Sequence, residues 1–209
     1  MNYDVLIVGG GPSGLMLASR LSKKLSVLVI EEHESVGFPQ HCAGLISIEA
    51  LRSMSKWPIK YRIAFLIVYY SGCRLSEACR MLQSFQPDRW IDLGHYGRYA
   101  LMWTRGSKKT IWLYIPSWLR LKIEKPISID YINFKSYLDK HLTLKPKYIR
   151  KFWYQLALSI IKDRELVDFM QGRASLSIGS IHYDNLLAKA DQAYSEILQA
   201  LEKLRNKAH

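Results

Sequence analysis

The residues of this chain best suited to chemistry are cations that can bind a phosphate and a tyrosine that can attack it. Lys147 and Arg150 stand three positions apart in the string KYIR, so on a helix both project from one face. Arg173 follows 23 residues after Arg150, and Tyr183 follows ten residues after Arg173. Guanidinium groups hold phosphate oxygens through paired N–H donors, and a phenol is a nucleophile once activated. This spacing predicts one site in which several cations and a phenol face a phosphate.

A further arginine upstream belongs to the same set. The string SGCRLSEA, residues 71–78, places Arg74 at the start of an expected helix, directly after a glycine turn. Glu77 follows one turn later. We expect its carboxylate either to support the Arg74 guanidinium or to lie exposed as an ordinary surface charge, and the sequence leaves both readings open.

Taken together, these segments resemble the catalytic domain of tyrosine recombinases, and they are most similar to integrases of archaeal spindle-shaped viruses from about Leu51 to the C-terminus. SGCRLSEA is similar to the first box of that family, KYIR to the second, and GRAS followed by Tyr183 to the third. The resemblance implies an α+β fold over residues 49–209, mainly α-helical with a small β-hairpin or sheet. Two positions depart from the wider superfamily, because Lys147 and Arg173 replace its usual second-box and third-box histidines.

The resemblance also implies the reaction, which is DNA cleavage and rejoining by transesterification. Tyr183 attacks the scissile phosphate and leaves a 3′-phosphotyrosyl link and a free 5′-hydroxyl. Arg74, Arg150 and Arg173 stabilise the charge that develops on the phosphate oxygens. Lys147 positions the phosphate or accepts the tyrosine proton. Neither a metal nor a cofactor is required for this reaction.

The pattern of apolar residues predicts the elements that position these groups. Residues 99–104 and 110–115 are rich in aromatic and β-branched residues and predict a β-hairpin. The resemblance places the mobile lysine of the family, which protonates the leaving 5′-oxygen, at Lys108 or Lys109, and Lys109 is slightly favoured of the two. The alternative is a hairpin tip whose charges are merely solvated. Tyr183 is expected between two helices, whereas the competing nucleophile, Tyr194, falls on the apolar stripe of the last helix. The expected helices span residues 60–70, 75–82, 130–142, 145–161 and 186–204.

The first 48 residues carry a different signal. Residues 3–8 and 26–30 predict strands on either side of a helix over residues 15–24. Gly9, Gly11 and Gly14 form G-x-G-x-x-G at the first turn, and Glu31 lies 17 residues beyond Gly14. In this context the glycines allow a pyrophosphate to approach the helix N-terminus, and the carboxylate can bind a ribose hydroxyl.

The segment from Asn2 to about Ile48 is similar to the start of flavin-dependent geranylgeranyl reductases, with residues 42–44 in their substrate-side cysteine motif. A dinucleotide site is built across two βαβ halves, so one half cannot enclose FAD. We therefore expect residues 1–48 to be a truncated Rossmann-like βαβ fragment without cofactor, joined to a recombinase domain in a chimeric chain. FAD is expected only under the alternative function, a truncated oxidoreductase of the geranylgeranyl reductase type.

The charge is concentrated in the second part of the chain, which indicates a nucleic-acid partner. The formal net charge is +12, with three Lys or Arg against five Asp or Glu in residues 1–49 and 27 against 13 in residues 50–209. A basic excess with interleaved aromatic residues is typical of phosphate-backbone binding, although a solvated basic surface is the alternative. We expect double-stranded DNA as partner. The arm and core-binding domains of the family are not recognisable before Leu51, so we expect weak binding with little sequence preference.

Composition limits the remaining possibilities. The longest apolar run, Ile63–Tyr70, is too short to span a bilayer, so a buried helix is expected there and no membrane partner. No secretory leader is recognisable, which favours a cytoplasmic location. Cys42, Cys73 and Cys79 are expected to be free thiols, with no metal site. In the resembling family the segment after the tyrosine also contacts a neighbouring protomer, which implies a homo-oligomer on DNA.

Overall fold

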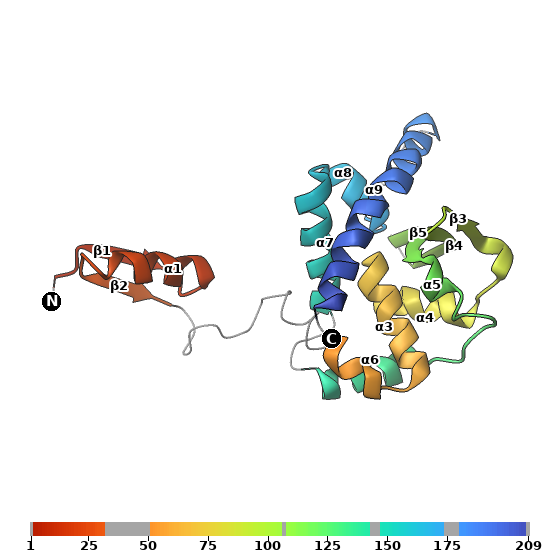
Figure 1. Ribbon diagram of the computed structural model, residues 1–209, viewed down its shortest axis with the longest axis horizontal. Helices are drawn as coiled ribbons and strands as arrows, with labels where there is room; N and C mark the ends of the chain where they lie inside the picture. The colour runs from red at the N-terminus through yellow and green to blue at the C-terminus, as the bar shows by residue number, and fades with distance from the viewer. Residues whose placement is uncertain (1, 32–50, 106–107, 143–146, 174–179, 208–209) are drawn as a thin grey trace. The chain divides into compact units, whose positions relative to one another are not determined.

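The computed structural model describes residues 2–31, 51–105, 108–142, 147–173 and 180–207. The chain divides into two compact units, Met1–Cys42 and Ala43–His209. Helices predominate in the larger unit, which also contains a small antiparallel sheet, and a parallel strand pair occurs in the smaller one (Figure 1). The fold is therefore α+β.

Residues 2–31 of the smaller unit form a βαβ motif with the elements β1 (Val5–Val8), α1 (Pro12–Leu21) and β2 (Val27–Ile30). The strands are parallel, with Val5 opposite Val27. The helix begins earlier than the sequence predicted, because Pro12 favours the first helical turn. Gly14 allows this turn to close, since a Cβ atom there would lie 2.1 Å from the Gly9 carbonyl oxygen. Large apolar side chains such as Val8, 80% exposed, remain uncovered within the described part of this unit.

In its described residues the larger unit contains helices, two 3₁₀ turns and one sheet. In chain order its elements are η1 (Met54–Lys56), α3 (Ile59–Ser71), α4 (Leu75–Gln83), η2 (Pro87–Arg89), β3 (Trp90–Asp92), β4 (Tyr96–Arg105), β5 (Lys108–Pro116), α5 (Ser117–Arg120), α6 (Tyr131–His141), α7 (Lys147–Ile161), α8 (Arg164–Met170) and α9 (Ser180–Asn206). The strands form an antiparallel sheet in the order β3-β4-β5.

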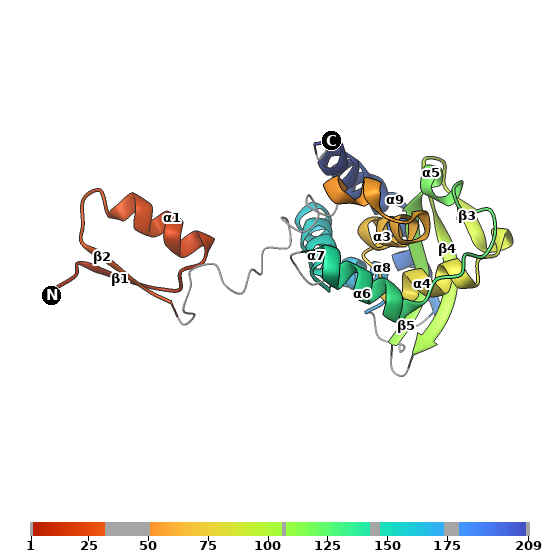
Figure 2. The same cartoon turned by 90° about the horizontal axis from the view of Figure 1, so that it is seen from below.

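Helix α3 is the centre of this unit. It packs against β5, α4 and α7, and its C-terminal end also contacts α9 (Figures 1 and 2). Residues 63–71 are all buried, as expected for a helix that is apolar on every side, and the prediction of a buried helix there is confirmed. Its C-terminal end is fastened by side chains from α7 and α9, because the Trp153 indole and the Tyr194 hydroxyl each donate to the Tyr70 carbonyl.

Further features of the larger unit differ from the sequence-based expectations. The sheet has a third strand, β3, whose three residues are too few to give an alternating pattern. Helix α8 is also too short to show a full apolar period. Helix α9 begins at Ser180, so Tyr183 lies within a helix and the expectation of a position between two helices is wrong. The first turns of α9, Ser-Ile-His-Tyr-Asp-Asn, lack the apolar spacing that marks the rest of the helix.

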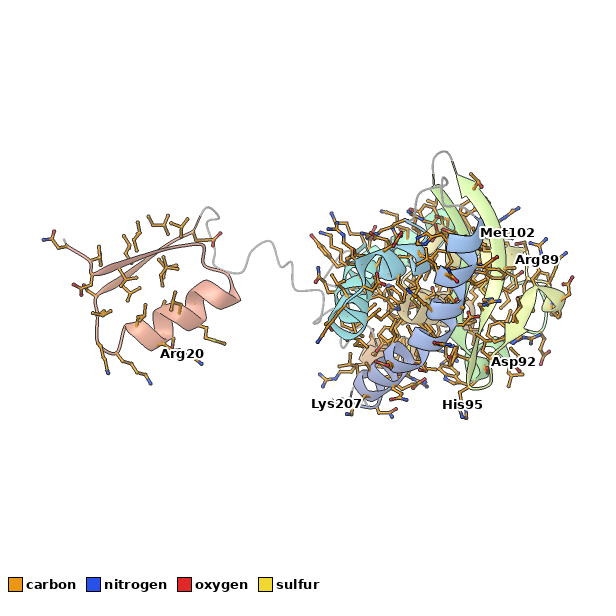
Figure 3. The ribbon with its side chains drawn as sticks, turned by 90° about the horizontal axis from the view of Figure 1, so that it is seen from above. Arg20, Arg89, Asp92, His95, Met102 and Lys207 are labelled. Atoms are coloured by element: carbon orange, nitrogen blue, oxygen red, sulfur yellow. The ribbon has the colours of Figure 1, made fainter. Side chains whose placement is uncertain are left out.

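The long hairpin of β4 and β5 is irregular in the middle. The strand register shifts between Ala100 and Trp103, and the intervening Met102 has a φ of 48°. Positive φ is uncommon for a residue with a side chain and is tolerated at such irregularities. The Met102 side chain is 61% exposed (Figure 3).

Two composition-based expectations concern described residues. Cys73 and Cys79 are buried free thiols, as predicted, whereas Cys42 lies outside the described residues. Among the helices that the structure describes, none combines the length and the apolar character needed to cross a bilayer.

Candidate functional site

Arg74 is placed by the junction of α3 and α4. Helix α3 ends at Ser71. The next residue, Gly72, has a φ of 63°, and a Cβ atom there would lie 2.4 Å from the Trp153 ring. Only glycine fits this combination of conformation and close contact. The chain then turns directly into α4, with Arg74 as the residue that caps its N-terminus. The local sequence therefore holds an arginine at a helix start, as the spacing predicted.

Glu77 is a buried carboxylate bound to Arg74 and to the sheet. It accepts hydrogen bonds from the Arg74 backbone N–H at 2.6 Å and from the Arg74 guanidinium. The Thr110 hydroxyl of β5 also donates to it, at 2.7 Å. Of the two readings left open by the sequence, the structure therefore has the carboxylate against the guanidinium and not exposed at the surface. A buried carboxylate with three donors fixes the direction in which Arg74 leaves the helix.

Arg150 is held by two backbone carbonyl groups from different segments. Its Nε donates to the Gly72 carbonyl at 3.0 Å, and its Nη2 donates to the Gln171 carbonyl at 2.7 Å. The Gln171 side-chain amide in turn donates to the Arg150 carbonyl at 2.9 Å. Arg150 thus joins the end of α3 to the segment that follows α8.

Arg173 reaches the same place from the end of α8. Gly172 adopts a φ of 63° and turns the chain, and the Arg173 N–H donates to the Asp168 carbonyl at 2.8 Å. The exposed Arg173 guanidinium packs over the Tyr154 ring, 4.5 Å from its centroid. The face of the aromatic ring attracts the guanidinium, so the Arg173 side chain can keep this position without an anionic partner.

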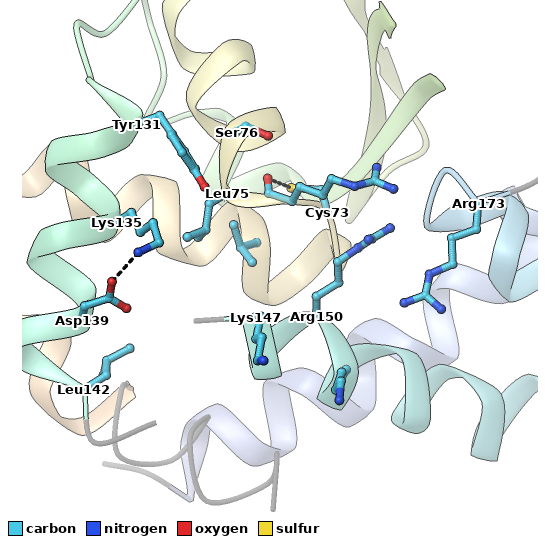
Figure 4. A pocket seen from close by; sticks show the side chains of 13 residues that line it. Cys73, Leu75, Ser76, Tyr131, Lys135, Asp139, Leu142, Lys147, Arg150 and Arg173 are labelled. Atoms are coloured by element: carbon cyan, nitrogen blue, oxygen red, sulfur yellow. Dashed lines mark hydrogen bonds and ion pairs between the residues drawn. The ribbon is translucent and has the colours of Figure 1, made fainter. Parts of the chain in front are cut away.

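These side chains line one cavity of about 860 Å³, within the range of small-ligand pockets. Figure 4 shows Arg150 and Arg173 reaching toward the same open space from different elements. Burial and, to a lesser degree, the neighbouring charges of Arg74 and Arg173 together lower the pKa of Arg150 to about 10. A cavity in which cations repel one another in this way favours an anionic ligand. The lining residues are Val68, Cys73, Arg74, Leu75, Ser76, Tyr131, Lys135, Asp139, Leu142, Lys147, Arg150, Lys151 and Arg173.

Lys147 belongs to the same cavity but lies at its edge. It is the first residue of α7 and is exposed. Its Nζ is 5.2 Å from the centroid of the Tyr148 ring, and the Lys151 Nζ is 5.1 Å from the same ring. The first two residues of the helix expected over residues 145–161, Lys145 and Pro146, lie outside the described residues.

Tyr183 is not among the described residues that line the cavity. Its hydroxyl oxygen accepts a hydrogen bond from the Trp112 indole of β5 at 2.7 Å, and its ring packs edge-on against Phe169 at 5.3 Å. Burial raises the pKa of Tyr183, while the Trp112 hydrogen bond and the Arg98 charge oppose this rise. The structure therefore gathers the arginines but holds the phenol at a second location. Tyr194 is fully buried, as its place on the apolar stripe suggested.

Lys108 and Lys109 lie at the start of β5, beside the hairpin turn. Their side chains fall outside the described residues. They directly precede Thr110 in this strand. Because the Thr110 hydroxyl donates to Glu77, the strand reaches the Arg74 end of the site.

Sequence reasoning missed two residues that contact the site. Gln171 immediately precedes Gly172 and is 1% exposed, and its Oε1 has no hydrogen-bond partner within the described part of the chain. Trp112 lies in the middle of a strand rich in aromatic residues. The position of Gln171 next to the third box was a usable signal, whereas nothing local distinguished Trp112 from its aromatic neighbours.

The glycine-rich turn of the smaller unit fits only part of a dinucleotide. Gly9 has a φ of 103°, and neither Gly9 nor Gly11 would bring a Cβ atom within 4 Å of another group, so a phosphate has room to approach. However, the Glu31 carboxylate accepts the N–H of Gly10, one of the donors of this turn. The described residues 2–31 contain one βαβ motif, and the second half that completes such a site is not among them. These residues do not fit a whole FAD or NAD.

Comparison with known proteins distinguishes the same two parts. The profile of an NAD(P)-binding Rossmann-like domain matches residues 7–41, and that of the archaeal phage integrase family matches residues 47–200.

Curated relatives match over short segments. The uncharacterized protein MJ1520 of Methanocaldococcus jannaschii is 45% identical over 53 residues, which are 25% of this chain and 13% of that protein. The digeranylgeranylglycerophospholipid reductase of Methanosarcina mazei is 41% identical over 51 residues, 24% of this chain and 12% of the reductase. Protein CbrA of Escherichia coli is 38% identical over 55 residues, 25% of this chain and 16% of CbrA.

The chain thus spans 12% to 16% of the length of these curated relatives. The integrase profile, in contrast, covers well over half of the chain and includes every residue that lines the arginine cavity. The protein belongs to the archaeal phage integrase family.

Proposed function

We propose that the larger unit is a tyrosine recombinase domain that cleaves and rejoins double-stranded DNA through a 3′-phosphotyrosyl intermediate. The observation that carries this proposal is the cavity in which Arg74, Arg150 and Arg173 converge from three separate elements. Each arginine is held by contacts of its own, so the cluster exists before an anion enters it. Preorganised cations of this kind stabilise a phosphorane-like transition state more than the ground state.

The reaction exchanges one phosphodiester bond for another. The Tyr183 oxygen bonds to phosphorus as the bond from phosphorus to the 5′-oxygen breaks, and the phenol proton leaves to a base. Lys147, in its neutral form, is the candidate base, or it positions the phosphate as a cation. The 5′-oxygen receives a proton from Lys108 or Lys109. Rejoining is the same sequence reversed, because the phosphotyrosyl link retains the energy of the broken bond.

Glu77 has a supporting role in this proposal, whereas the smaller unit has none. Glu77 holds Arg74 in position but does not itself touch the phosphate. Residues 50–209 have a formal net charge of +14, which attracts the negatively charged DNA backbone. Residues 1–48 form a truncated dinucleotide-binding fragment that takes no part in recombination, and no cofactor is needed.

Trapping the covalent intermediate tests the proposal. The full chain is incubated with a pool of nicked duplexes of random sequence, in which the cleaved end diffuses away and rejoining fails. We expect a DNA-linked protein that resists denaturant, with the attached nucleotide on the peptide that contains Tyr183. Tyr183→Phe keeps the ring and its contact with Phe169, so this variant should fold normally and give no adduct.

Two outcomes contradict the proposal. An adduct that persists undiminished in Tyr183→Phe means that another residue is the nucleophile. The absence of any adduct across the whole pool, with duplex DNA bound normally, means that the domain binds DNA without cleaving it.

A further inference from the structure

We propose that Trp112 is a positioning residue that holds the nucleophile in a resting location outside the arginine cavity. Tyr183 must leave this location before it can attack a phosphate bound by Arg74, Arg150 and Arg173. This inference rests on the proposed function, and it concerns a residue that lies outside the three boxes.

The resting location is built from two elements that flank the tyrosine. The Trp112 indole N–H donates to the Tyr183 oxygen at 2.7 Å, close to the ideal length for such a bond. On the other side, the Phe169 ring of α8 meets the Tyr183 ring edge-on, at 72° and 5.3 Å between centroids. One polar and one aromatic contact together fix both the oxygen and the plane of the ring.

Trp112 is itself held firmly, which makes it suitable as an anchor. The Arg98 guanidinium of β4 packs over its ring at 4.7 Å, and Arg98 forms an ion pair with Asp191 of α9. The Tyr114 hydroxyl of β5 donates to the same carboxylate at 2.7 Å. The sheet therefore also binds α9, the helix that carries Tyr183, at Asp191, two turns after the tyrosine.

The phenol and the arginines have different neighbours. Tyr183 is not among the described residues that line the cavity, whereas Arg74, Arg150 and Arg173 are. The charged groups with the largest effects on the pKa of Tyr183 are Arg98 and Asp184, and those with the largest effects on the pKa of Arg150 are Arg74 and Glu77. In its present position the phenol is therefore surrounded by other side chains than those proposed to bind the phosphate.

The contact with Trp112 has two opposing effects on the phenol. A hydrogen bond donated to the oxygen favours the phenolate, but it also occupies the lone pair that must attack phosphorus. The net contribution of one hydrogen bond of this type shifts the equilibrium between the held and the released phenol by about 2- to 10-fold. We therefore expect the bond to slow cleavage by a factor of this size, because only the released fraction of Tyr183 is competent.

Trp112→Phe tests the inference, because it removes the indole N–H and keeps an aromatic ring. The matched control is Trp118→Phe, since the Trp118 indole also donates to a side chain of α9, Glu202, at 2.9 Å, without touching Tyr183. The initial rate of adduct formation on the nicked duplex pool should rise by about 2- to 10-fold in Trp112→Phe and stay unchanged in the control. Phe169→Leu loosens the same location from its other side and should act in the same direction.

A second measurement needs no DNA. Acetylation of Tyr183 by N-acetylimidazole, followed by mass spectrometry of its peptide, reports how often the phenol is released. This rate should rise by a similar factor in Trp112→Phe and not in Trp118→Phe.

The outcomes separate this inference from the proposed function. Slower adduct formation in Trp112→Phe, or acetylation equal to that of the wild type, overturns the resting location. If the wild type forms no adduct, the proposed function fails, and the acetylation rates still decide whether Trp112 holds the phenol.

Discussion

Arg150 and Gln171 are joined by two reciprocal hydrogen bonds, in which the Arg150 guanidinium donates to the Gln171 carbonyl and the Gln171 amide donates to the Arg150 carbonyl. The pair ties α7 to the chain immediately before Arg173. Two arginines that are 23 positions apart in the sequence thereby share one anchor, so their separation at the cavity is fixed by a residue that need not touch the ligand.

The first prediction concerns this anchor. Gln171→Met keeps the volume and the backbone carbonyl but loses the amide that binds Arg150. We expect the cleavage rate to fall by about 10- to 100-fold, since small displacements of positioning groups have effects of this order. Unfolding free energy should change by no more than about 1 kcal/mol, because one neutral hydrogen bond is lost and the unpaired Oε1 is removed.

Gln83→Met is the matched control for this prediction. The Gln83 amide donates to the Ile129 carbonyl at 2.7 Å and is not among the residues that line the cavity. Stability should change by a similar amount, while cleavage stays near the wild-type rate. Equal losses of cleavage in both variants would mean that Gln171 has a general structural role only.

The second prediction concerns Glu77. Glu77→Gln places an amide among three donors, so at least one buried donor loses its acceptor. The free energy of unfolding should fall by about 1–3 kcal/mol. The cleavage rate should fall as well, because the Arg74 guanidinium loses its charged partner. Chemical denaturation and adduct formation measure the two effects.

Thr110→Val provides the comparison for Glu77, since it removes one donor and leaves Arg74 paired. Thr110→Val should lower the free energy of unfolding by less than Glu77→Gln does, and most of the cleavage rate should remain. If Glu77→Gln retained full cleavage, Arg74 would not depend on this carboxylate for its position.

The parts of the site that follow local rules were predictable from the sequence. Arg74 at a helix start, with Glu77 one turn later, depends on neighbours within three residues. The buried stretch of α3 follows from apolar residues on every side. The resemblance of the boxes supplied Arg150 and Arg173, whose mutual distance no local pattern encodes.

The remaining features depend on packing between distant segments. The bond between Trp112 and Tyr183 joins residues 71 positions apart, and it exists because α9 lies against β5. The link between Arg150 and Gln171 likewise requires the packing of α7 on α8. The early start of α9 was missed because its first turns are polar, so periodicity indicated a loop where the helix in fact carries Tyr183.

A third prediction concerns flavin. The purified full chain should lack stoichiometric FAD, because the glycine-rich turn belongs to one βαβ motif and Glu31 binds one of its amides. An absorbance spectrum of the protein, before and after addition of FAD and gel filtration, measures this directly. A yellow protein with about one flavin per chain would contradict the expectation and favour the oxidoreductase.

A fourth prediction concerns DNA binding. The formal charge of +12 should give affinity for duplexes of any sequence, with the logarithm of the binding constant falling by about 0.9 per phosphate contact for each logarithmic unit of salt. Lys147→Ala should reduce this slope by about one contact, because the lysine is exposed at the cavity edge. Fluorescence anisotropy across a salt series provides the slopes. Binding that is independent of salt would exclude the backbone as the main partner.

The last prediction concerns anions in the absence of DNA. The pKa of Arg150 is lowered to about 10 by burial and by the charges of Arg74 and Arg173. The charged form of Arg150 is therefore destabilised when no anion is bound. A bound sulfate relieves this repulsion and should stabilise the fold by about 1.4 kcal/mol at ten times its dissociation constant. For a domain of this size, that corresponds to a rise in Tm of about 3–6 °C.

Arg173→Gln separates this effect from general screening by salt. The side chain is exposed, and its main contact is with the Tyr154 ring, so the variant should fold as the wild type does. It removes one cation from the cavity, which should weaken the stabilisation by sulfate and leave the small effect of chloride unchanged. Thermal unfolding in sulfate and in chloride at equal ionic strength measures the difference. If sulfate and chloride stabilised the wild type equally, the arginines would not form an anion site, and the cluster would lose its role as the phosphate clamp.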